Sequence, residues 1–81
     1  MIHSKKIWEI IRNNLLRGKW VTLEEIYQMI ENNWNLDTED FEWQSHTSEI
    51  PKWKRNVRNV LQYRKRKNEI LWDRAAKYKI I

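Results

Sequence analysis

The chain of 81 residues contains no cysteine, one glycine and one proline. The absence of cysteine excludes a disulfide framework and a thiolate zinc site, so the fold must depend on packing alone. A single glycine excludes a glycine-rich phosphate loop. No apolar run approaches the roughly 18 residues that a membrane span needs, and the N-terminus lacks the apolar segment of a signal peptide. We therefore expect a cytoplasmic protein with one domain, residues 1–81.

Patterns for catalysis are missing as well. The carboxylates between residues 37 and 49 lie in a polar connection, not on the rigid scaffold that a metal-dependent nuclease needs. His3 and His46 are isolated, without a second ligand at helical spacing, and there is no supported Ser/His/Asp arrangement. The sequence predicts no enzyme, no catalytic residue, no metal and no cofactor. Any catalysis would belong to a partner, such as a nuclease domain or subunit.

The charge of the chain is divided between its two parts. The net charge is +5, but residues 1–50 carry five Lys or Arg against nine Asp or Glu, whereas residues 51–81 carry eleven against two. A basic segment of this kind attracts nucleic acid or an anionic membrane. A membrane-binding helix would present Trp, Leu or Phe on its free face. The free face of the basic helix is instead polar, so we predict double-stranded DNA as the partner and no membrane.

This basic helix is predicted over residues 51–67. Pro51 suits the first helical position, where its missing amide would have no partner, and Asn68 can adopt the left-handed conformation that ends a helix. At about 100° per residue, one face of the helix points inward. The residues of that face are Trp53, Val57, Val60, Leu61 and Arg64.

The opposite face carries the residue types that recognise DNA. Arginine pairs with guanine, asparagine and glutamine pair with adenine, and further cations neutralise phosphates. The residues predicted to lie near base edges are Arg55, Arg58, Asn59 and Gln62. The residues predicted to lie near phosphates are Lys52, Lys54, Arg66, Arg74 and Lys77. The competing interpretation is a solvated basic helix that only keeps the protein soluble.

A first helix is predicted over residues 4–17, because its apolar residues follow helical spacing. Ser4 is the expected cap, and Gly18 is the expected left-handed residue at its end. Residues 19–21 then form an extended link or a first strand.

A second helix is predicted to begin at the sequence Thr-Leu-Glu-Glu, residues 22–25. This is a capping-box pattern, in which the Thr22 hydroxyl accepts a hydrogen bond from the amide of Glu25. The helix is expected to end at Asn32 and Asn33.

The connection over residues 32–50 is acidic, yet it contains several large apolar residues. A disordered linker would not usually carry so many. We expect one short helical turn over residues 38–43, with Leu36 and Phe41 packed against the core. Trp34 and Trp43 are expected to be partly exposed, either as core covers or as ligand contacts.

Two strands are predicted after the basic helix, over residues 69–72 and 77–80. In the second strand, Tyr78 and Ile80 alternate with lysines, so they should share one face. The order of elements is typical of a winged helix-turn-helix, an α+β fold with three main helices and a C-terminal β-hairpin wing.

The chain also resembles a known family. An acidic turn (Thr38-Glu39-Asp40), the sequence Pro51-Lys52-Trp53, a basic amphipathic helix and a short hairpin together resemble the winged-helix domains of Mrr-type restriction endonucleases. Similar domains occur in modification-dependent restriction enzymes, including those that depend on adenine methylation. The resemblance covers roughly residues 20–81. The family usually has glycine after the recognition helix and in the wing, where this chain has Asn68 and residues 74–76.

The resemblance implies binding of double-stranded DNA in a restriction-type system, with preference for a modified base such as N6-methyladenine or 5-methylcytosine. Such a reader needs an apolar surface at the added methyl group. The candidates for this contact are Trp34, Trp43, Ala75 and Ala76. Two alternatives stay open, a small standalone transcriptional regulator of winged-helix type and a protein-interaction winged helix that docks an acidic partner.

Overall fold

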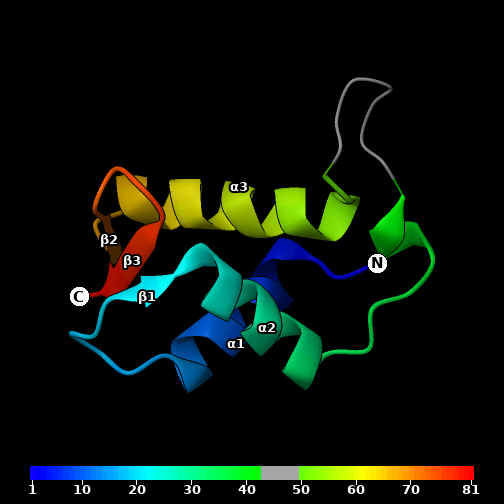
Figure 1. The fold of residues 1–81 in the computed structure, drawn as a ribbon, viewed down its shortest axis with the longest axis horizontal. Helices are drawn as coiled ribbons and strands as arrows, with labels where there is room; N and C mark the ends of the chain where they lie inside the picture. Colours follow the sequence, from blue (N-terminus) through cyan, green and yellow to red (C-terminus); the bar gives the residue numbers. More distant parts are fainter. Residues whose placement is uncertain (43–49) are drawn as a thin grey trace.

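The computed structural model of the protein describes residues 1–42 and 50–81. Its elements are α1 (Ser4–Asn14), β1 (Val21–Thr22), α2 (Leu23–Asn33), the short 3-10 helix η1 (Glu39–Phe41), α3 (Lys52–Arg66), β2 (Ile70–Trp72) and β3 (Lys77–Ile80). Figure 1 shows α3 lying across α1 and α2, with the small sheet at the C-terminal end of α3. No helix in the described part of the chain is long and apolar enough to cross a membrane.

The three strands form one antiparallel sheet in the order β1-β3-β2. Val21 of β1 pairs with Tyr78, and Ile80 on the same strand β3 pairs with Ile70 of β2. Of the link predicted over residues 19–21, only Val21 lies in a strand, and β1 adds to the hairpin along β3, at the edge opposite β2. This arrangement confirms the α+β winged-helix fold class.

The ends of α1 differ from the sequence prediction. His3, not Ser4, occupies the N-cap position, and no side chain in the described part of the protein caps this helix. The helix ends at Asn14, three residues before the predicted end. Gly18 does have a left-handed φ of 78°, but it serves the link to β1, where its amide donates to the carbonyl of Ile80 at 3.0 Å.

The ends of α2 and α3 can be compared with the local sequence signals. The Thr22 hydroxyl accepts from the amide of Glu25 at 3.1 Å, as the capping box predicts. The sequence predicts Pro51 at the first helical position, but in the structure Pro51 is the N-cap of α3 and Lys52 is the first helical residue. Asn68 follows α3 with a φ of 59°, which confirms the predicted left-handed residue.

The core forms where the inward face of α3 meets α1 and α2. The buried residues of α3 are Trp53, Val57, Val60 and Leu61. The ring of Trp53 meets that of Tyr27 edge-on, with centroids 5.5 Å apart. Arg64, predicted to share this face, is only half-buried, because its guanidinium lies 4.8 Å from the Trp8 ring and pairs with Glu69 at 3.1 Å. The guanidinium of Arg64 therefore lies at the edge of the core.

The acidic connection is fixed by one buried carboxylate. Asp40 is 0% exposed and accepts hydrogen bonds from the amide of Ile2 at 2.9 Å and the amide of Asp37 at 3.0 Å. Leu36 packs against the core as predicted. Phe41 does not, since 55% of it is exposed. The inward position of this turn is taken by Asp40, whose side chain satisfies two backbone amides that would otherwise lack partners.

Candidate nucleic-acid interface

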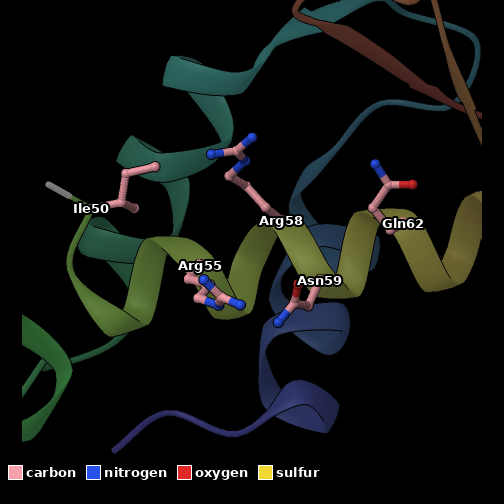
Figure 2. A pocket seen from close by; sticks show the side chains of 5 residues that line it. All are labelled: Ile50, Arg55, Arg58, Asn59 and Gln62. Atoms are coloured by element: carbon pink, nitrogen blue, oxygen red, sulfur yellow. The ribbon is translucent and has the colours of Figure 1, made fainter. Parts of the chain in front are cut away.

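The free face of α3 brings together the four residues predicted to lie near base edges. All four are exposed, and they line one hollow of about 270 Å³ together with Ile50. We call this the recognition hollow; its residues, shown in Figure 2, are Ile50, Arg55, Arg58, Asn59 and Gln62. The hollow therefore combines guanidinium and amide groups with one apolar side chain.

The side chains of the hollow spread over one exposed face of α3. In Figure 2, Arg58 and Gln62 extend toward the side of α2, whereas Arg55 and Asn59 lie in front of the helix ribbon. Burial raises the pKa of Tyr27 on α2, and the nearby positive charge of Arg58 counteracts that rise. Arg58 therefore belongs to the α2 side of the interface.

The first turn of α3 holds two of the lysines predicted to contact phosphates. Lys52 forms an ion pair with Glu42, with Nζ and Oε2 3.3 Å apart. Lys54 lies over two aromatic rings, with its Nζ 4.9 Å from the ring of Tyr27 and 5.6 Å from that of Trp53. Both lysines thus have partners within the protein, and a phosphate would have to compete with them.

The other predicted phosphate contacts lie at the C-terminal end of α3 and in the wing. Arg66 is exposed on the last turn of α3, and Arg74 and Lys77 are exposed in the hairpin. These cations are open to solvent, as contacts to a DNA backbone must be.

The wing forms its turn without glycine. Asp73 accepts hydrogen bonds through Oδ1 from the amide of Ala75 at 2.8 Å and from the amide of Lys77 at 3.1 Å. Arg74, directly after Asp73, has a left-handed φ of 69°. The indole of Trp72 donates to the carbonyl of Ala75 at 3.3 Å. An aspartate that accepts hydrogen bonds from the backbone amides that follow it stabilises a tight turn, so the wing turns without glycine.

These hydrogen bonds from Ala75 and Lys77 lower the pKa of Asp73 below the ordinary aspartate value. Because the pKa of Asp73 is lower in the folded protein than in the unfolded chain, its ionised carboxylate stabilises the turn at any pH above the unfolded-state pKa. This stabilisation is lost as the pH falls through the folded-state pKa. We expect the amide NMR signals of Ala75 and Lys77 to shift together in acid, with a midpoint below that of an ordinary aspartate. Asp73→Asn, which cannot titrate, should lack this transition. A midpoint at or above the ordinary value would contradict the role of Asp73.

The residues predicted to contact a methyl group do not gather at the recognition hollow. Trp34 is 37% exposed at the end of α2, and Lys6 lies over its ring at 5.4 Å. It lines a separate hollow whose lining comes from residues 31–35. Ala75 and Ala76 are exposed in the wing, and Trp43 lies outside the described residues.

Ile50 is the apolar residue that the sequence prediction missed. It is half-buried and lines the recognition hollow beside Arg58 and Asn59. Its only signal in the sequence is its position, as an apolar residue directly before Pro51 at the end of a polar segment.

The structure offers no obvious metal centre in residues 1–42 and 50–81, where no group of three or more His, Asp or Glu side chains is placed to hold an ion. His3 is exposed, and His46 lies outside these residues.

Comparisons with known protein families, curated proteins and solved structures give no match to this chain. The family resemblance of the sequence therefore stays a prediction. Function has to be inferred from the chemistry of the interface itself.

Proposed function

We propose that this chain is a double-stranded DNA-binding winged-helix module that places α3 in the major groove. One observation carries the proposal: four side chains with base-pairing chemistry are all exposed around a single hollow. The opposite face of the same helix is buried through Trp53, Val57 and Val60. The reading face is thus held on a rigid element, as recognition of base edges requires.

The position of the wing supports this geometry. In winged-helix proteins that bind DNA, the third helix enters the major groove and the hairpin reaches the adjacent backbone or minor groove. Figure 1 shows the hairpin at the C-terminal end of α3. Arg66, Arg74 and Lys77 then supply exposed positive charge along this end of the interface, where it can neutralise phosphates.

The finer proposal is that the module reads a modified base, N6-methyladenine or 5-methylcytosine, as the targeting part of a restriction-type system with a nuclease domain or subunit as its partner. Support comes from the family resemblance and from Ile50, whose apolar side chain lines the recognition hollow at the N-terminal end of α3. A methyl group in the major groove is recognised by apolar contact of this kind. The protein would then act in the cytoplasm, at the nucleoid.

The test is selection from a random duplex library, prepared unmodified, with N6-methyladenine and with 5-methylcytosine. We expect salt-dependent binding with enrichment of one short sequence over the rest of the library. Equal affinity for modified and unmodified copies of that sequence would remove the modified-base proposal alone. Failure to bind any duplex even at low salt would overturn DNA binding and favour the protein-interaction alternative.

A further inference from the structure

A second hollow, of about 400 Å³, lies between α1 and α3 and adjoins the recognition hollow. We call it the α1–α3 groove; it is lined by Ser4, Lys5, Asn59, Val60, Tyr63 and Arg64. Asn59 belongs to both hollows, so the groove begins where the base-reading face ends. Among the described residues that line it, none is acidic.

The cations beside this groove are available to an outside partner. Within residues 1–42 and 50–81, neither Lys5 nor Lys67 forms an ion pair, whereas Lys52 is paired with Glu42. Both Lys5 and Lys67 are exposed. Exposed, unpaired lysines can contact phosphate without first losing an internal ion pair.

Tyr63 lies along α3 between Asn59, which lines the recognition hollow, and Lys67. It is 45% exposed, and the Nζ of Lys67 lies 5.4 Å from its ring. Asn59, Tyr63 and Lys67 are spaced four residues apart, so they follow one side of α3 and its C-cap. This row presents an amide, a hydroxyl and an ammonium group in sequence along the border of the groove.

The groove continues on the far side of Arg64 into a further hollow beside α1. That hollow is lined by Lys5, Trp8, Glu9, Arg12, Asn13 and Arg64. Its one carboxylate, Glu9, is already paired with Lys6 at 3.2 Å. Arg64 is paired with Glu69, whereas Lys5 and Arg12 form no ion pair within the described residues and supply the positive charge of this hollow.

We propose that the α1–α3 groove holds the sugar–phosphate backbone of one DNA strand, with Lys5, Tyr63 and Lys67 as its phosphate contacts. This inference rests on the proposed function. It adds Lys5, Tyr63 and Lys67 to the contacts that the periodicity of the basic helix predicts. The bound duplex is therefore contacted from α1 as well as from α3 and the wing. Lys5 differs from Lys52 and Lys54, which lie on the first turn of α3 and have internal partners.

The experiment is to measure the salt dependence of duplex binding for Lys5→Ala and Lys67→Ala. Each substitution should reduce the slope of log K against log salt by about one unit, while the preferred sequence stays the same. Tyr63→Phe should weaken binding several-fold without changing the slope, because it removes only a neutral hydroxyl. The matched control is Lys19→Ala, which makes the same charge change in the link before β1 and should leave the slope unchanged.

Ethylation of single phosphates gives the second readout. The parent protein should show interference at phosphates on one strand, and Lys5→Ala should lose part of that pattern. An unchanged slope for both lysine variants, in a protein that binds duplexes, would overturn the groove while leaving the proposed function intact. Equal loss of slope in Lys19→Ala would also overturn it, because the effect would then come from net charge alone. A parent that binds no duplex would overturn both proposals.

Discussion

Replacing Asn59 with alanine is expected to relax the preference for an adenine at one position of the target by about 1 to 3 kcal/mol. The amide of asparagine pairs with both N6 and N7 of adenine, and alanine can make neither hydrogen bond. Asn59 lies in the middle of the exposed face, at the junction of the two hollows. The measurement compares the affinity for the selected duplex with that for a duplex in which this adenine is replaced, for parent and variant.

Lys54→Ala tests a predicted phosphate contact, whereas Asn59→Ala tests a predicted base contact. This substitution should weaken all duplexes alike and reduce the salt slope by about one unit, because a phosphate contact carries no sequence information. Lys54 lies over the rings of Tyr27 and Trp53, so part of its charge is already used within the protein. Equal losses on every sequence for both variants would contradict the division between base-reading and phosphate-binding residues.

The fold could be predicted from the sequence largely because its signals are local. The two faces of α3 follow from helical periodicity, and the start of α2 follows from a hydrogen bond between Thr22 and Glu25, three residues apart. The alternation of Tyr78 and Ile80 likewise predicts the buried face of β3. Because the exposed face of α3 is the complement of its buried face, the exposure of the four residues proposed to contact base edges could be predicted too.

Other features could not be predicted, because they depend on partners distant in the sequence. Asp40 is buried because it accepts the amide of Ile2, 38 residues away, and this bond turns Phe41 outward. The local hydrogen bond from the amide of Asp37 to Asp40 does not by itself indicate burial, which depends on the distant contact with Ile2. The pairing of Val21 with Tyr78, which adds β1 to the sheet, involves a strand of only two residues.

Two features of the candidate nucleic-acid interface also depend on residues that are distant in the sequence. Periodicity places Lys52 on the first turn of α3, but the ion pair with Glu42 across the connection becomes visible only in the structure. The contribution of α1 to the groove depends on how two helices pack, and Lys5 alone carries no signal for it.

Trp53 should be the most sensitive position for stability. Its side chain is only 2% exposed and meets the ring of Tyr27 edge-on at 5.5 Å. Trp53→Ala is expected to cost about 3 to 5 kcal/mol, the usual range for removing a buried aromatic side chain. Since small domains are stable by only about 5 to 15 kcal/mol, much of the folding free energy would be lost. Urea denaturation followed by circular dichroism measures this loss.

Trp53→Phe separates the packing of this residue from its polar group. The indole Nε1 of Trp53 is buried and has no hydrogen-bond partner within residues 1–42 and 50–81, so phenylalanine removes a polar group that makes no hydrogen bond there. Phenylalanine keeps an aromatic ring for Tyr27 and leaves a smaller cavity than alanine does. We therefore expect Trp53→Phe to lose much less stability than Trp53→Ala and to keep α3 in place. Equal destabilisation by the two variants would mean that the indole nitrogen, rather than the volume and ring contact of Trp53, holds the buried face of α3.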